Sequence, residues 1–188
     1  MFDELIRQIE ALTKEKNPVV VGISGFGGSG KTTLANQIRD YFKIENGQTV
    51  RLDNLFAENH KDKPIFEDYD WRVISKLLRD VRSAKRLQYQ GRGFFGEAIP
   101  FDEPMPCVVI VEGVRLFRPE SVDQFDIAVW IDASLEFATK RGEQRDKERG
   151  ADEAHVKRWE TEWAPKDKEY FDTYSPQKLA TFLYKEYK

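Results

Sequence analysis

The stretch Gly25-Phe26-Gly27-Gly28-Ser29-Gly30-Lys31-Thr32 decides how this chain folds. It fits the pattern G-x-x-x-x-G-K-S/T, in which glycines let backbone N–H groups close around phosphate oxygens. The apolar run Val19–Ser24 before it predicts a buried strand, and residues 33–39 after it have a helical pattern. This order places a phosphate at a helix N-terminus, where the helix dipole favours negative charge. We therefore interpret the stretch as a nucleotide-binding loop and name it the phosphate loop.

The phosphate loop combines a backbone cradle with two side chains that have separate tasks. In loops of this pattern the lysine reaches the β- and γ-phosphates, and the hydroxyl after it holds Mg²⁺. Here those side chains belong to Lys31 and Thr32. We expect the nucleotide to be bound by these residues: Gly25, Gly27, Gly28, Ser29, Gly30, Lys31, Thr32 and Thr33. A glycine-rich turn that only happens to precede a lysine would not explain the strand and helix on either side.

Strands and helices are predicted to alternate along the rest of the chain. Further apolar runs predict strands at 49–52, 107–111, 127–131 and 181–184. Apolar residues at helical spacing predict helices at 2–14, 31–43, 69–87, 134–149 and 151–163. Residues 54–68 are expected to form a loop, and the stretch 88–105, which contains glycines and prolines, an irregular segment or a short hairpin. The alternation predicts an α/β fold of the P-loop NTPase type, a mostly parallel sheet with helices on both faces.

Composition and charge limit the partners that the chain can have. The net charge of −3 argues against general nucleic-acid binding, and no apolar run approaches the ~20 residues that a membrane span needs. The acidic start, residues 1–4, lacks the basic region of a secretory signal. Cys107 is the single cysteine, and because it precedes an apolar strand we expect a buried thiol. These features predict a cytoplasmic protein without nucleic-acid or membrane partners.

Acidic residues follow several of the predicted strands. In a parallel sheet the ligand lies beyond the carboxyl ends of the strands, and this edge receives Asp53, Glu112 and Asp132. Glu112 ends an apolar strand and precedes a glycine, which is where a Walker-B-like carboxylate holds Mg²⁺ directly or through water. A solvated strand-end acid is the alternative. The phosphate loop favours a metal site made of Thr32 and Glu112.

Asp53 ends its strand and is the candidate catalytic carboxylate. Near a γ-phosphate it could accept the proton of an attacking hydroxyl, or it could bind Mg²⁺. The alternative is an aspartate that starts an Asx turn, a common way to end a strand. We favour the functional interpretation, without deciding between base and metal ligand.

Arg141, Arg145 and Arg149 are spaced four residues apart within a predicted helix, so they share one face. Their guanidinium groups could neutralise charge on a phosphoryl group during its transfer. The spacing alone fits a solvated face with ion pairs to Glu and Asp at least as well.

The segment Arg141-Gly142-Glu143-Gln144-Arg145-Asp146-Lys147-Glu148-Arg149-Gly150 resembles the lid of the uridine kinase-like family. Three further pieces occur in that family's order: the phosphate loop, Asp53-x-x-Phe56, and Val109-Ile110-Val111-Glu112-Gly113. The resemblance covers about residues 18–150. We expect one kinase domain over 1–188, with an N-terminal helix in 1–17 and a lid with its following helix at about 134–165.

The resemblance implies an ATP-dependent kinase that phosphorylates a small-molecule hydroxyl with Mg²⁺. It implies that Asp53 is the catalytic base, that Lys31 and Thr32 bind phosphate and metal, and that the lid arginines close over the phosphates. Arg141 and Arg145 would then be catalytic. Asp70 resembles the family aspartate that binds substrate hydroxyls, although a helix N-cap is an equal alternative.

The chain departs from uridine kinases in the segment 87–96, which contains no histidine. This argues against uridine or cytidine as the acceptor. Tyr89 and Arg92, together with Phe94, are expected to line the acceptor pocket, whereas Phe94 and Phe95 could instead belong to the core.

Four other aromatic residues are expected to have no part in the chemistry. His60 and His155 lie in polar surroundings and are expected to be solvated. Trp159 and Trp163 are one helical turn apart and are expected to pack together, with stacking on the substrate as the alternative.

These observations predict a kinase that transfers the γ-phosphate of ATP to a hydroxyl of a nucleoside-, sugar- or vitamin-like molecule. The alternatives are a nucleotide-binding regulatory protein without catalysis and a nucleoside monophosphate kinase. A GTPase switch is disfavoured because the chain contains neither an N-K-x-D nor a D-x-x-G motif. The sequence leaves open the acceptor, the preferred nucleoside triphosphate and the oligomeric state, for which a homodimer is one option.

Overall fold

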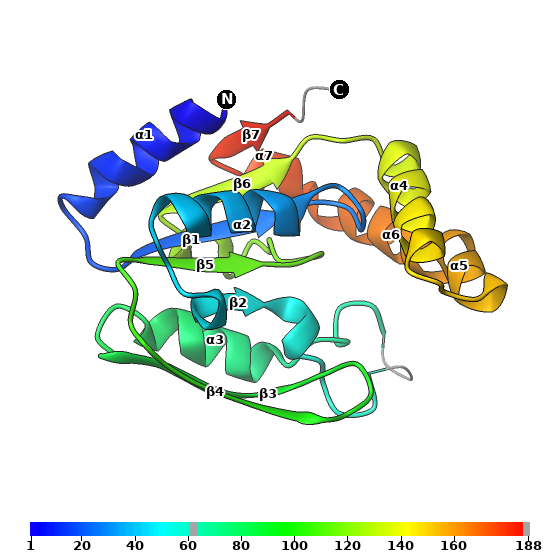
Figure 1. The fold of residues 1–188 in the computed structure, drawn as a ribbon, viewed down its shortest axis with the longest axis horizontal. Coiled ribbons are helices and arrows are strands. Elements are labelled where there is room, and N and C mark those ends of the chain that lie inside the picture. The colour runs from blue at the N-terminus through cyan, green and yellow to red at the C-terminus, as the bar shows by residue number, and fades with distance from the viewer. Residues whose placement is uncertain (61–63, 186–188) are drawn as a thin grey trace.

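A five-stranded parallel sheet forms the centre of the protein. The computed structural model describes residues 1–60 and 64–185 (Figure 1). The strands lie in the order β2-β5-β1-β6-β7, and every neighbouring pair is parallel. Their bounds are β1 Val19–Ser24, β2 Thr49–Arg51, β5 Val108–Glu112, β6 Ile127–Ile131 and β7 Phe182–Tyr184. The predicted α/β fold is confirmed. The sheet was expected to be mostly parallel, and all of its strand pairs are parallel.

Helices cover both faces of the sheet. Their bounds are α1 Phe2–Thr13, α2 Lys31–Tyr41, α3 Trp71–Asp80, α4 Leu135–Glu148, α5 Glu153–Arg158, α6 Ala164–Tyr174 and α7 Pro176–Leu179. Helices α1 and α2 pack on one face through apolar side chains that include Leu5 and Leu34. Helices α3 and α6 pack on the other face through Ile74 and Tyr170. Helices α4, α5 and α6 gather beyond the carboxyl end of the sheet (Figure 1).

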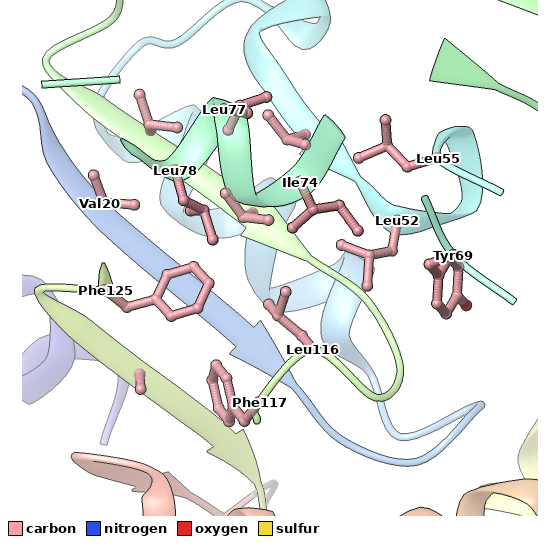
Figure 2. Packing of buried hydrophobic residues seen from close by; sticks show 14 of the residues in the cluster. Val20, Leu52, Leu55, Tyr69, Ile74, Leu77, Leu78, Leu116, Phe117 and Phe125 are labelled. Carbon is pink, nitrogen blue, oxygen red and sulfur yellow. The ribbon is translucent and has the colours of Figure 1, made fainter. Parts of the chain in front are cut away.

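The strands divide their side chains between the two cores by strict alternation. In β1, Val20 enters the core under α3, whereas Val19 and Val21 enter the core under α1 and α2. This follows from the period of two in a strand. Figure 2 shows the first of these cores, where side chains of α3 meet Val20 and Phe125. The central strands β1, β5 and β6 are buried on both faces and are nearly continuous apolar runs, as expected for a parallel sheet, whereas the edge strands β2 and β7 are only partly buried.

A separate antiparallel hairpin lies beside α3 (Figure 1). It consists of β3, Arg86–Arg92, and β4, Ala98–Pro104. The predicted helix at 69–87 is therefore too long, because α3 ends at Asp80 and the chain turns into β3. Leu87 continues the apolar pattern from a strand, and its side chain joins the same core as α3. The apolar spacing alone did not reveal this change of structure.

Other departures from the predictions lie at segment ends. Cys107 is exposed and not buried as predicted, because it precedes β5 at the amino end of the sheet. Only its backbone carbonyl joins the sheet, where it accepts a hydrogen bond from Val19 N–H at 2.9 Å. Helices α6 and α7 were not predicted, since most of their residues are polar or only partly buried. In residues 1–60 and 64–185 we find no helix with the length and apolar character that crossing a membrane requires.

Candidate active site

The phosphate loop connects β1 to α2 and lies directly beneath the lid helix α4. Gly28 has φ of +80°, and a Cβ there would lie 2.2 Å from the carbonyl oxygen of Ala138 in α4. Glycine is therefore required at this position by both conformation and space. Lys31 is buried, and its Nζ donates a hydrogen bond to the carbonyl oxygen of Phe26 at 2.8 Å. Burial lowers the pKa of Lys31, and the nearby Glu112 partly opposes this effect.

Glu112 and Thr32 meet at the carboxyl end of the sheet. The parallel register pairs Glu112 with Ile23 of β1 and Arg51 of β2, which places it beside the phosphate loop. The hydroxyl of Thr32 donates a hydrogen bond to Glu112 Oε1 at 3.0 Å. Burial raises the pKa of Glu112, and Lys31 partly offsets this rise.

This pair of oxygen ligands fits Mg²⁺, which prefers hard oxygen donors and usually takes its other ligands from water and substrate phosphates. Within residues 1–60 and 64–185 no group of three or more His, Cys, Asp or Glu side chains forms a metal cage. A magnesium ion held here would therefore depend on the nucleotide for part of its coordination.

Asp53 lies in a 3₁₀ turn, Leu52–Asn54, that follows β2. Its side chain faces the same cleft as Lys31 and Glu112, and it is near enough to influence the pKa of both. Asp53 has no hydrogen-bond or ion-pair partner among the residues that the structure describes. The predicted strand ends one residue earlier than expected, so Asp53 is carried by the turn and not by the strand itself.

Two arginines of α4 and the arginine that caps its C-terminus line the cleft on the side of the phosphate loop. Arg141, Arg145 and Arg149 all border it, whereas the i,i+4 ion pair Lys140–Glu136 lies on the exposed side of the helix. Arg141 is partly buried, but Arg145 and Arg149 are exposed, so the solvated-face alternative stays open for them. Their roles toward phosphate stay predictions.

Trp159 attaches the lid to the phosphate loop. Its indole Nε1–H donates a hydrogen bond to Asp146 Oδ2 at 2.8 Å, and Asp146 Oδ1 accepts another from Arg145 Nε at 2.9 Å. The ring of Trp159 lies over Gly27 and Gly142, where an added Cβ would approach within 2.8 Å and 2.5 Å. Trp159 and Trp163 pack together as predicted, with ring centroids 4.9 Å apart, and both also border the cleft.

An aromatic cluster, consisting of Phe56, His60, Tyr69 and Phe94, forms the wall opposite the lid. The ring of Phe56 stacks on His60 at 4.4 Å and on Tyr69 at 5.1 Å, and Phe94 approaches it at 5.6 Å. His60 is buried, so its predicted solvation is wrong, because the polar residues around it in sequence do not surround it in space. Phe95 at the hairpin tip is 85% exposed and does not belong to the core.

Three predicted acceptor residues do not reach this cleft. Asp70 caps α3, where its Oδ1 accepts hydrogen bonds from the N–H groups of Arg72 and Val73 at 3.2 and 3.4 Å. Arg92 and Asp70 border a separate hollow of about 110 Å³. Tyr89 stacks on Phe101 at 4.5 Å. Asp70 is thus an N-cap, one of the two roles considered for it, and the hairpin directs Tyr89 toward its own partner strand.

A buried ion cluster in the cleft has no counterpart among the predictions. Arg115 pairs with Asp68 Oδ2 at 2.7 Å and with Asp167 Oδ1 at 2.9 Å, and all three residues are buried. Asp167 Oδ2 also accepts the backbone N–H of Gly27 in the phosphate loop at 2.6 Å. The only sequence signal for this cluster was that Arg115 follows the Glu112-Gly113 strand end by two residues.

The phosphate loop, the lid and the aromatic cluster enclose one cleft of about 1200 Å³. A cleft of this size has room for two small molecules, one at the phosphate loop and one beside the aromatic cluster. A phosphate loop under an arginine-bearing helix, at the edge of a parallel sheet, defines a P-loop kinase.

Comparison with known proteins specifies the family. The uridine kinase of Lactiplantibacillus plantarum is 31% identical over 152 residues, which cover 73% of this chain and 72% of the relative. The uridine kinase of Limosilactobacillus reuteri is 28% identical, covering 72% and 68%. The chain therefore belongs to the uridine kinase-like family of P-loop kinases, and it is an ATP-dependent enzyme that phosphorylates a hydroxyl of a small molecule.

Two further comparisons concern the fold. A solved structure described as a fructose transport system kinase from Silicibacter sp. TM1040 superposes with a TM-score of 0.76 at 17% identity, covering 98% of each chain. The NB-ARC domain family matches residues 2–51. That match ends at β2, so it contains the phosphate loop but neither Glu112 nor the lid. Both likenesses agree with the P-loop fold.

Proposed function

We propose that Asp53 is the general base that takes the proton of the acceptor hydroxyl as it attacks the γ-phosphate. The observation that carries this proposal is that Asp53 lies in the same cleft as Lys31 and the Thr32–Glu112 pair and forms no hydrogen bond or ion pair with the described part of the chain. In phosphoryl transfer, positioning and neutralisation of charge supply most of the catalysis, and a base needs only to lie within reach of the hydroxyl.

The nucleotide half of the cleft supplies the positive charge. We infer that the N–H groups of the phosphate loop and Lys31 hold the β- and γ-phosphates, while Arg141 and Arg145 contact them from the lid. Thr32 and Glu112 would hold Mg²⁺, which would neutralise charge on the phosphate oxygens when bound. Arg149 follows the last residue of α4 and borders the same cleft, so we infer that it contacts the nucleotide from the end of the lid.

We propose that the acceptor is a nucleoside-like molecule, which has a flat ring and a primary hydroxyl. The aromatic cluster presents the stacked rings of Phe56, His60 and Tyr69, and flat rings pack well against such a wall. The sequence argued against uridine because the hairpin lacks a histidine. In the structure His60 brings an imidazole to this wall from another segment, so that argument loses its weight.

Asp68 is the carboxylate that we propose for a second contact to the acceptor, in place of Asp70. It borders the cleft, whereas Asp70 does not. Its Oδ2 is bound to Arg115, but its Oδ1 accepts no hydrogen bond among the described residues. A buried acceptor oxygen of this kind gains from a hydroxyl donor supplied by a substrate.

The proposal is tested by measuring ADP release from Mg-ATP over a panel of acceptors. The panel contains ribonucleosides, their 5′-deoxy analogues, pantothenate-like alcohols, sugar phosphates and nucleoside monophosphates. We expect turnover with at least one nucleoside and none with its 5′-deoxy partner, which has the same ring but lacks the hydroxyl. Preferential turnover of a monophosphate or of a ring-free alcohol would overturn the acceptor class.

The same panel also tests the regulatory alternative. Binding of ATP without transfer to any acceptor would favour the regulatory alternative. Because the reaction consumes ATP and the chain has a net charge of −3, we propose that it acts in the cytoplasm without nucleic acid or membrane.

A further inference from the structure

The buried cluster of Arg115, Asp68 and Asp167 connects the two halves of the cleft. Arg115 follows β5, Asp68 lies in the loop before α3, and Asp167 lies in α6. Asp167 reaches the phosphate loop through Gly27 N–H at 2.6 Å. Asp68 reaches the segment around Asp53, because its carbonyl oxygen accepts the N–H of Ala57 at 2.9 Å. One guanidinium group thus links the phosphate loop to the acceptor side.

Two features show that Arg115 is held in this place at a cost. Its φ of +58° lies in the left-handed region, which is unfavourable for a residue other than glycine. Its side chain is buried, and removing a guanidinium from water is expensive unless its partners compensate. The carboxylates of Asp68 and Asp167 compensate with two charged hydrogen bonds. An ion pair in such surroundings is stiff, because breaking either bond leaves a buried charge.

The charge state of Arg115 is consistent with ion pairs to Asp68 and Asp167 that persist. Burial alone would lower the pKa of Arg115, but its acidic neighbours raise that pKa overall, so the guanidinium stays charged. Burial raises the pKa of Asp68, while the charge of Arg115 acts against this rise.

We propose that Arg115 is a positioning residue that couples nucleotide binding at the phosphate loop to the placement of Asp68 and the acceptor segment. A nucleotide that orders Gly27 would, through Asp167 and Arg115, hold Asp68 in position for the acceptor. By reciprocity, an acceptor bound at Asp68 would raise the affinity for the nucleotide. The assignment of Asp68 to the acceptor side rests on the proposed function, but the mechanical link does not.

The test uses Mg-AMP-PNP as the only ligand and backbone amide hydrogen exchange, resolved by NMR, as the readout. The reporters are the amides of Ala57 and Asp70, which donate to Asp68 O at 2.9 Å and to Leu55 O at 2.7 Å. In the wild-type chain we expect Mg-AMP-PNP to slow their exchange at least about fivefold, the lower end of typical coupling. In Arg115→Met this slowing should fall below about twofold.

Arg118→Met is the matched control. Arg118 is a buried arginine three residues further along the same loop, where it stacks on Trp71 at 3.7 Å and donates to Phe66 O, but it does not border the cleft. Its loss removes a comparable buried cation that contacts the same segment around Asp68, but it leaves the bonds of Arg115 to Asp68 and Asp167 in place. We expect it to retain the nucleotide-induced slowing, and Arg115→Lys to restore part of it.

Asp167→Asn provides a second route if Arg115→Met does not fold. The asparagine oxygen can still accept the N–H of Gly27, whereas its NH₂ group cannot pair with Arg115, so only the link is weakened. Its control is Asp126→Asn, another buried carboxylate that accepts a backbone N–H, from Val20 at 2.8 Å, at the opposite end of the sheet. The nucleotide-induced slowing of amide exchange should be lost in Asp167→Asn and kept in Asp126→Asn.

The proposal is overturned if the wild-type chain shows no nucleotide-induced slowing at Ala57 and Asp70. It is equally overturned if Arg115→Met and Asp167→Asn keep that slowing, or if Arg118→Met loses it to the same degree. Because no acceptor is present, these outcomes are independent of the acceptor panel. The acceptor class could therefore be wrong while the link is intact, or correct while the link is absent, and the two experiments would distinguish these cases.

Discussion

Replacing Asp53 by asparagine separates catalysis from stability more cleanly than any other change in the cleft. The substitution keeps the size of the side chain but removes its ability to take a proton. General-base catalysis contributes typically 10²–10⁴-fold, so we expect turnover to fall by about that factor, or about 2.7–5.5 kcal/mol in activation free energy. Asp53 is exposed in its turn and has no hydrogen-bond or ion-pair partner among the described residues, so the substitution removes only its longer-range electrostatic interactions with groups such as Lys31 and Glu112. The free energy of unfolding should change by less than about 0.5 kcal/mol, which shifts the Tm by about 1–2 °C.

The assay measures ADP release with the acceptor that the panel selects, together with thermal unfolding and titration with Mg-AMP-PNP. Nucleotide affinity should stay near the wild-type value, since the phosphate loop is unchanged. Asp132→Asn is the matched control, because Asp132 also follows a strand at this edge of the sheet but does not border the cleft. A loss of turnover smaller than about tenfold in Asp53→Asn, or an equal loss in Asp132→Asn, would refute the role of Asp53 as base.

Three further substitutions test the site and its support. Lys31→Met should lower turnover at least about a hundredfold without lowering the Tm, because burial lowers the pKa of Lys31 and removing a buried charge offsets the lost hydrogen bond; a folded, active variant would contradict this. Trp159→Phe removes the N–H that donates to Asp146 and should cost about 1.5–3 kcal/mol in urea unfolding, more than the control Trp163→Phe. Burial raises the pKa of Asp126, but hydrogen bonds from its basic partners and Val20 N–H lower it overall. Asp126→Asn should therefore lower the unfolding free energy by about 1.5–3 kcal/mol at pH 7, and this difference should shrink as the pH falls below the ordinary value of 3.8; a difference that does not change with pH would show that the charge is irrelevant.

The parts of the fold that the sequence predicted are those in which local pattern and tertiary environment agree. β1, the phosphate loop and α2 are contiguous, and each step has its own chemical signature. The three central strands, β1, β5 and β6, are nearly continuous apolar runs because both faces are covered. The hairpin illustrates the opposite case: Leu87 extends the apolar spacing of α3, yet it lies in a strand, because the core accepts an apolar side chain from either kind of backbone.

Residues whose importance depends on distant partners could not be recognised in the same way. Arg115 is one arginine in a short loop, and only the fold brings Asp68 and Asp167 to it, from positions 47 and 52 residues away in the chain. His60 was assigned to solvent for the same reason, since its sequence neighbours are polar while its spatial neighbours are aromatic rings. Burial of a polar residue is decided by tertiary contacts, and no periodicity in the sequence reports them.

This difference explains why the sequence predicts the nucleotide site more clearly than the acceptor site. We propose that the phosphates are bound by backbone N–H groups of one loop, and a site of this kind requires a fixed run of glycines that can be recognised directly in the sequence. The aromatic cluster that we propose as the acceptor wall is assembled from three separate segments, which contribute Phe56 with His60, Tyr69, and Phe94 at the hairpin tip. Each contributes one or two side chains, and none requires a particular local sequence. A change in any one segment can therefore alter the acceptor while the phosphate loop, the lid and the sheet remain the same, as expected when one scaffold serves several substrates.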